Sequence, residues 1–119
     1  MDRKRKEAER RGRLGEDFAA LLLLLKGYRI LGRRVKTAAG EIDLIAKSLT
    51  GVVCCVEVKT RPAEGLAEVR SRQRARIVRA ANLFMAGRPA PLRFDVITVA
   101  PWRIRHHRDA WRPDDLKGL

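Results

Sequence analysis

Residues 40–61 read GEIDLIAKSLTGVVCCVEVKTR, two segments rich in Val, Ile and Leu joined by a short turn of Ser, Thr and Gly. This pattern predicts a β-hairpin. Because side chains alternate between the faces of a strand, we expect Glu41 and Asp43 on one face of the first strand. Glu57 and Lys59 are expected on one face of the second. The apolar residues Ile42, Leu44, Val56 and Val58 would fill the opposite face.

Two interpretations of these charged residues are open. If both polar faces are the same face of the sheet, three carboxylates and an ammonium group meet there. Such a cluster suits a divalent metal, because like charges held together repel one another. The alternative is a solvent-exposed face in which Glu57 pairs with Lys59, Arg61 or Lys36. Spacing alone fits both.

The composition points to one basic domain. The 119 residues are enough for one compact core, and 27 Lys and Arg against 14 Asp and Glu give a formal net charge of +13. This balance predicts a polyanionic partner, with nucleic acid first and anionic lipid second. The longest apolar run, residues 18–25, is shorter than the roughly 20 residues of a membrane-spanning helix, and no signal-peptide cleavage site follows. We therefore expect a cytoplasmic protein without a membrane partner.

Cysteine and histidine are not expected to hold a metal. Cys54 and Cys55 are adjacent on a predicted strand, so they point to opposite faces and suit neither a disulfide nor a shared ligand role. Both fit as small apolar core residues. His106 and His107 are also adjacent, with no further ligand at suitable spacing, so no zinc site is predicted.

The N-terminal region divides into two parts. Residues 1–12 form a basic segment, for which a solvated, disordered tail that runs into a helix is the favoured interpretation. Residues 13–119 form the predicted domain. Its first helix begins at residue 12 or 14 and ends before Gly27. The helical wheel places Glu16 away from the main apolar stripe, which favours an exposed side chain. That stripe, expected to pack on the sheet, is Leu14, Phe18, Leu21, Leu22 and Leu25.

The remaining elements complete an α/β fold. Residues 28–36 predict a strand with a bulge at Gly32, before the central hairpin. A second helix over residues 66–86 leads to a strand over residues 92–100, which a right-handed crossover would place parallel to the second hairpin strand. The expected architecture is a single-domain α-β-β-β-α-β core with a mixed sheet flanked by helices. Residues 102–106 would add a short edge strand.

The second helix carries an amide and a basic face. Gln73 falls within an otherwise apolar stripe, and a buried amide must find hydrogen bonds. It either bonds at the sheet edge or faces the acidic cluster of the hairpin, and both interpretations are open. The basic face suits phosphates, with a merely solvated face as the alternative. Its members are Arg70, Arg72, Arg74, Arg76 and Arg79.

Several motifs extend along almost the whole chain from Gly12. They are Gly15-Glu16 with Ala19, Lys26-Gly27-Tyr28 with Ile30-Leu31, Gly40-Glu41-Ile42-Asp43-Leu44-Ile45, Val56-Glu57-Val58-Lys59-Thr60-Arg61, Arg79-Ala80-Ala81, Arg93-Phe94-Asp95-Val96-Ile97 and Ala110-Trp111. Together they resemble the YraN family of small bacterial proteins. That family is similar in fold to Holliday-junction resolvases of the PD-(D/E)XK nuclease superfamily. In those nucleases an acidic residue near one strand precedes a Glu-x-Lys on the next.

The resemblance implies roles for individual residues. Asp43 and Glu57 would be the ligands of Mg²⁺ or Mn²⁺, and Lys59 would contact the scissile phosphate or the attacking water. Glu16 matches the helical Glu that completes such sites, against the exposed position that the wheel favours. Gln73 falls where the family more often carries Lys. The residues expected to bind nucleic acid are Arg61, Arg70, Arg72, Arg74, Arg76 and Arg79.

Three functions follow as hypotheses. The leading one is a Mg²⁺-dependent endonuclease that acts on DNA through structure rather than sequence, with branched DNA as one candidate substrate. The alternative is a non-catalytic nucleic-acid-binding module that keeps the nuclease fold. A third is a basic protein that binds RNA or the ribosome. DNA is the expected partner ahead of RNA, and a homodimer is open.

Overall fold

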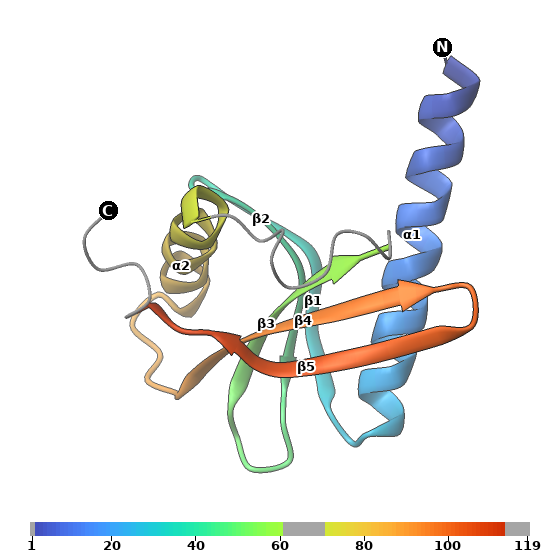
Figure 1. Ribbon diagram of the computed structural model, residues 1–119. Coiled ribbons are helices and arrows are strands. Elements are labelled where there is room, and N and C mark those ends of the chain that lie inside the picture. Colours follow the sequence, from blue (N-terminus) through green and yellow to red (C-terminus); the bar gives the residue numbers. More distant parts are fainter. Residues whose placement is uncertain (1, 61–70, 114–119) are drawn as a thin grey trace.

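The computed structural model describes residues 2–60 and 71–113 (Figure 1). Its elements in chain order are α1 (Asp2–Leu25), β1 (Arg29–Thr37), β2 (Gly40–Lys47), β3 (Val53–Lys59), α2 (Ser71–Met85), β4 (Leu92–Ala100) and β5 (Arg103–Trp111). The predicted α-β-β-β-α-β order is confirmed. The edge strand is longer than expected, because β5 pairs with β4 along nearly its full length.

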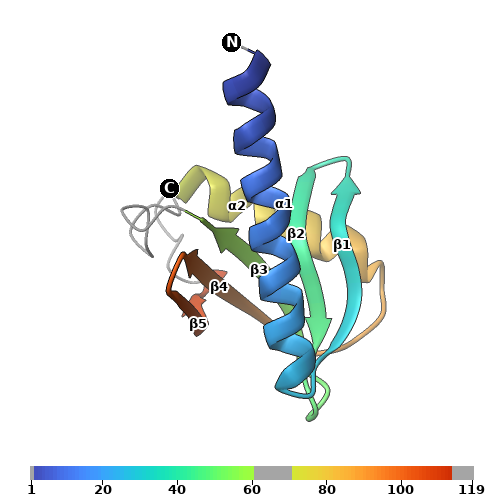
Figure 2. The same ribbon diagram turned by 90° about the vertical axis from the view of Figure 1, so that its right-hand side faces the viewer.

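The strands form one mixed sheet in the order β1-β2-β3-β4-β5. Strands β3 and β4 are parallel, joined by the crossover that contains α2, and the other neighbours are antiparallel. Helices α1 and α2 cover opposite faces of the sheet (Figure 2). The α/β class and the flanked mixed sheet are therefore as the sequence predicts.

Helix α1 extends further toward the N-terminus than the sequence suggested. It begins at Asp2, so most of the basic segment is helical in the structure and projects beyond the sheet (Figure 1), instead of forming a disordered tail. Once packing anchors a helix, each further residue adds a hydrogen bond at little cost. The Arg, Lys, Glu and Ala residues of this segment are all good helix formers.

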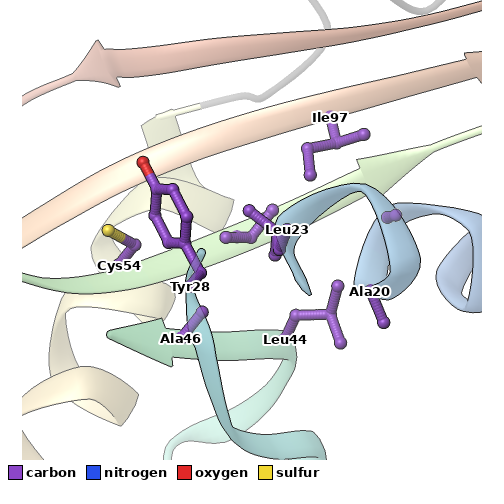
Figure 3. Packing of buried hydrophobic residues seen from close by; sticks show 9 residues of the cluster. Ala20, Leu23, Tyr28, Leu44, Ala46, Cys54 and Ile97 are labelled. Atoms are coloured by element: carbon purple, nitrogen blue, oxygen red, sulfur yellow. The ribbon is translucent and has the colours of Figure 1, made fainter. Parts of the chain in front are cut away.

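The packing face of α1 is not the one expected. The predicted stripe is largely exposed, with Leu14 and Phe18 each 49% exposed, whereas Ala19 is fully buried. Ala20 and Leu23 are also buried against the sheet (Figure 3). Small side chains on this face let the helix approach the strands closely. The prediction of the inward stripe was therefore wrong, because the largest apolar residues lie on the opposite side of the helix.

Two apolar clusters lie on the two faces of the sheet. Ala19, Leu23, Leu44, Cys54 and Ile97 are among the residues of the cluster under α1 (Figure 3). The cluster under α2 contains Ile42, Ile45, Cys55, Ile77 and Trp111, among others. The two cysteines are free, buried and on opposite faces, as predicted.

Local features of the hairpins also match the sequence. The β1–β2 register shifts between Ile30 and Gly32, where the bulge was expected. The Thr37 hydroxyl accepts hydrogen bonds from the amides of Ala39 and Gly40 in the following turn. The beginning of the predicted second helix, residues 66–70, lies outside the described residues. No helix in the described ranges is both long enough and apolar enough to cross a membrane.

Candidate metal and phosphate site at the β2–β3 fork

The sheet divides into two arms at one end. The last pair between β2 and β3 is Leu44 with Val56. Beyond it, residues 40–42 pair only with β1, and residues 57–59 pair only with β4. Figure 1 shows β2 and β3 separating toward this end. We call this opening, formed by residues 40–43 and 57–59, the β2–β3 fork.

Strand β2 turns over at Asp43. Ile42 packs in the cluster under α2, whereas Leu44 packs under α1, although alternate residues of a regular strand share a face. On β1, Arg34 lies at the same level and has a left-handed backbone with φ 48. This conformation is uncommon for a residue other than glycine and often marks a functional site. The expectation that Ile42 and Leu44 share one face was therefore wrong.

The Asp43 carboxylate closes part of the fork. Its Oδ2 accepts a hydrogen bond from the backbone amide of Val58 at 2.9 Å. That amide lies beyond the paired part of β2 and β3, so a side chain satisfies it in place of a strand carbonyl. The bond holds Asp43 beside the strand that carries Glu57 and Lys59.

Glu57 is buried at the root of the fork, with only 6% of its surface exposed. Its Oε2 accepts a hydrogen bond from the Gln73 side chain on α2 at 3.2 Å. Its Oε1 is buried and accepts no hydrogen bond from any residue that the structure describes. Of the two interpretations of Gln73, the structure shows the one in which the amide faces the acidic cluster.

Burial and neighbouring acidic side chains raise the pKa of both carboxyl groups. Burial, followed by the charge of Asp43, raises the pKa of Glu57 to about 8. Burial also raises the pKa of Asp43, and the charge of Glu16 adds to this against the hydrogen bond from Val58. The Lys59 charge lowers the pKa of both carboxyl groups, so its ammonium lies close enough to act on both.

Glu16 lies at the edge of this group and not in open solvent. Its side chain is 13% exposed, and Oε1 accepts a hydrogen bond from Arg34 Nε at 2.6 Å. Glu16 is on the side of α1 that packs on the sheet, which is the side of Ala20 and Leu23. The exposed position inferred from the wheel was wrong, because that inference took the larger leucines as the inward face.

Two of the ion pairs considered for Glu57, those with Lys36 and Lys59, are not what the structure shows. Within the described part of the chain, Glu57 makes no ion pair with Lys36 or Lys59, and Arg61 lies outside that part. Glu41 is exposed at the rim, across from Lys36 on β1. The fork therefore holds a half-buried Asp43 and a buried Glu57, neither of which forms an ion pair within the described residues.

Among residues 2–60 and 71–113, no three His, Cys, Asp or Glu side chains converge as a ready-made metal cage. Asp43 and Glu57 supply hard oxygen donors, and the unpartnered Oε1 is an available ligand atom. Mg²⁺ usually keeps several waters and takes one or two carboxylates together with substrate phosphate. The donor set therefore fits Mg²⁺ or Mn²⁺ held by two carboxylates, but not a fully protein-coordinated ion.

The arginines expected to bind nucleic acid differ in their surroundings. Arg76 and Arg79 are exposed on α2, and the Arg76 side chain packs beside Gly40 of the fork. Arg74 is half-buried, with its guanidinium 5.7 Å from the centre of the Trp111 ring, so it has a packing role. Arg61, Arg70 and the side chain of Arg72 lie outside what the structure describes.

A second polar cluster was not singled out by the sequence reasoning. Asp95 is fully buried on β4 and accepts hydrogen bonds from Arg93, from His106 and from the amide of Asp109. Arg93 also donates to the Tyr28 hydroxyl at 2.7 Å. Burial alone would raise the pKa of Asp95, but these hydrogen bonds lower it to about 2. An aspartate inside an apolar strand was the signal in the sequence.

Comparison with known proteins places the chain among small bacterial relatives. The model of Uncharacterised protein family UPF0102 matches residues 15–99. A UPF0102 protein of Maricaulis maris is 46% identical over 122 residues, which cover 97% of this chain and 95% of the relative. A UPF0102 protein of Paramagnetospirillum magneticum is 46% identical, over 90% of this chain and 91% of the relative. A UPF0102 protein of Agrobacterium fabrum is 47% identical, over 87% of this chain and 89% of the relative.

Proposed function

This chain belongs to the UPF0102 (YraN) family, and on that premise we propose that it is a metal-dependent endonuclease that hydrolyses phosphodiester bonds in DNA. The proposal includes a relation to the PD-(D/E)XK nucleases. The α-β-β-β-α-β order and the Asp and Glu-x-Lys residues at the fork support this relation. Recognition would depend on the structure of the DNA, because the exposed arginines suit backbone phosphates and do not read base sequence.

The observation that carries the proposal is the unsatisfied Glu57 Oε1. A buried carboxylate oxygen without a partner costs free energy, and here a second carboxylate lies beside it. A fold that needed only stability would pair or remove these charges. Such an arrangement is suited to binding a cation, since the ion compensates both the burial and the repulsion.

Asp43 and Glu57 would hold the metal. When bound, Mg²⁺ lowers the pKa of a coordinated water and offsets the negative charge that develops on the attacked phosphate. The chain's own groups then hold the two carboxylates in position. The hydrogen bond from Val58 fixes Asp43, and the hydrogen bond from Gln73 fixes Glu57.

Lys59 supplies a fixed positive charge on the same arm of the fork. It acts on both carboxylates, and an ammonium here would also face the phosphate that the metal polarises. A preorganised charge of this kind lowers the activation free energy by about 3 kcal/mol. Glu16 would accept a hydrogen bond from the attacking water once its ion pair with Arg34 opens.

One observation favours a non-catalytic nucleic-acid-binding module as the second candidate. Glu16 is engaged by Arg34, and no third acidic side chain in the described residues joins Asp43 and Glu57 at ligand distance. A module that only binds would need the exposed arginines and a stable fold. It would not need Glu57 to stay ionisable, and this separates the two candidates experimentally.

Cleavage assays on a panel of substrates test the proposal. Branched, single-stranded and duplex DNA and RNA would be incubated with the protein in EDTA, Mg²⁺ or Mn²⁺. We expect metal-dependent cleavage of at least one DNA, lost in Glu57→Gln with binding nearly unchanged. The matched control Glu41→Gln, at the exposed rim, should cleave normally. Wild-type binding without cleavage in any metal would instead assign the binding module.

A further inference from the structure

An apolar groove of about 530 Å³ lies where α1 meets the β4–β5 turn. Leu14, Gly15 and Phe18 line it from the helix, and Trp102 and Ile104 line it from the turn. Figure 1 shows this turn beside the middle of α1. We call it the Trp102 groove. None of the described residues that line it belongs to the β2–β3 fork.

Two aromatic rings in the groove are open to solvent. Trp102 is 93% exposed and Phe18 is 49% exposed. An indole at the tip of a turn gains nothing from burial, so its exposure does not serve the stability of the fold. Exposed aromatic rings in a groove are suited to stacking against another planar group. A nucleobase presents such a face whatever its identity.

The charge around the groove fits a polyanion. Arg103 lines it, Arg105 is exposed two residues further along β5, and Arg13 is exposed next to Leu14. No acidic side chain in the described residues lines the groove. With a net charge of +13 for the chain, this surface favours phosphate groups over a basic or neutral partner.

The lining of the groove includes direct sequence neighbours of the candidate site. Gly15 and Thr60 both line it, and each is next in sequence to a residue of the candidate site, Glu16 and Lys59 respectively. Gly15 lies directly against Thr60, where a methyl group would overlap the Thr60 side chain. A strand whose phosphate lies at Lys59 therefore has the groove as its neighbouring surface.

We propose that the Trp102 groove binds unpaired nucleobases of a strand that passes through the fork. The bases would stack on Trp102 and Phe18, and Arg103 would neutralise a flanking phosphate. Bases inside a continuous duplex are already stacked on each other and cannot offer their faces to a protein. This inference rests on the proposed function and narrows its substrate to nucleic acid with a single-stranded segment, such as a flap, a gap or an opened junction.

The two tryptophans make the test direct, because Trp102 is exposed and Trp111 is buried. Oligothymidylate of about 15 nucleotides should quench the fluorescence of wild-type Trp102. Trp102→Ala should weaken binding of this oligonucleotide roughly tenfold, and binding of an equally long duplex less than about twofold. Trp102→Phe should retain most of the affinity. Leu24 is an exposed apolar residue outside the groove, so Leu24→Ala is the matched control and should change neither the affinity for oligothymidylate nor that for the duplex.

Several results would overturn the inference. One is an equal loss of affinity for oligothymidylate and for the duplex in Trp102→Ala. Another is a wild-type affinity for oligothymidylate that the substitution leaves unchanged. A third is conversion of a dimer to a monomer by Trp102→Ala without a selective loss, since the groove would then be an interface between two copies. If Trp102→Ala selectively loses affinity for oligothymidylate but the wild type cleaves no nucleic acid, the result would support base binding in the groove and refute the proposed nuclease activity. Absence of any nucleic-acid binding by the wild type would refute both.

Discussion

Asp43 on β2 accepts a hydrogen bond from the backbone amide of Val58 on β3, with 2.9 Å between Oδ2 and N. The bond spans the fork just past the last paired residues of the two strands. It allows the strands to separate while it fixes a carboxylate between them. Because an asparagine oxygen can accept the same bond, the charge of Asp43 can be removed without losing this contact.

The raised pKa of Glu57 predicts an unusual pH dependence of stability. Its pKa is about 8 in the folded state, against an ordinary value near 4.5. Between these values the folded state holds more protons than the unfolded state, so the free energy of unfolding falls as pH rises. Glu57→Gln should lose most of this slope in EDTA and be more stable than wild type at about pH 8.5. Urea unfolding from about pH 5 to pH 9 measures it, with Glu41→Gln as control. An unchanged slope would mean that Glu57 is not held protonated by burial.

The contact of Gly15 with the end of β3 predicts a steric effect. A methyl group at Gly15 would overlap the Thr60 Cγ2 atom, so Gly15→Ala should destabilise the protein by about 1–3 kcal/mol. Thr60→Ser removes that methyl and should restore most of the loss in the double variant. Gly12→Ala, where nothing lies within 4 Å, should be neutral or stabilising by up to about 1 kcal/mol. Equal effects at both glycines would show that α1 does not pack on β3 this closely.

The Asp95 cluster predicts a large loss of stability when the charge of Asp95 is removed. Asp95→Asn would keep one acceptor oxygen but remove the buried negative charge and replace the other oxygen by an NH₂ donor, so Arg93 and His106 would lose part of their acceptor, at a cost of about 3–5 kcal/mol in chemical denaturation. Asp109→Asn at the exposed ion pair with Arg112 should change the stability by less than about 0.5 kcal/mol. The Asp95 contribution is present above its ordinary pKa and is lost as pH falls toward about 2. A variant as stable as wild type would show that the cluster is dispensable.

The exposed arginines predict a steep salt dependence of DNA binding. If about six phosphates are neutralised, affinity should fall roughly 10³-fold between about 50 and 200 mM salt. Arg76→Gln and Arg79→Gln should each lower the slope of log affinity against log salt by about 1. Arg29→Gln, exposed at the far end of β1, is the control and should leave the slope unchanged. A flat dependence in the wild type would assign the basic surface another role.

The order of elements could be predicted because each carries a local signal. The hairpin, the Gly32 bulge, the turn at Gly40 and the strand over residues 92–100 all follow from alternation and turn residues. Alternation also places Glu57 and Lys59 together on β3. These features are determined by residues close together in the sequence, so they can be predicted from one sequence alone.

The packing of α1 could not be predicted by the same route. Its leucines cover most of the circumference, so hydrophobicity did not identify the inward side. The decision lies in the small residues Gly15, Ala19 and Ala20, which allow close approach to β3. The same tertiary contact determines where Glu16 lies. The reversal of β2 at Asp43 lies beside the left-handed backbone of Arg34 on a neighbouring strand, which the hairpin sequence does not contain.

A thermal melt of two proteins tests the metal site most directly. Wild type and Asp43→Asn would each be melted in EDTA and in Mn²⁺. If Asp43 and Glu57 form a cation site, the variant should melt higher in EDTA at about pH 8.5, above the Glu57 pKa of about 8, because the repulsion between two ionised carboxylates is relieved. Mn²⁺ at a hundredfold excess over its dissociation constant should stabilise wild type by about 2.7 kcal/mol and the variant much less. A variant that melts below wild type in EDTA, with no response of either protein to Mn²⁺, would contradict the account.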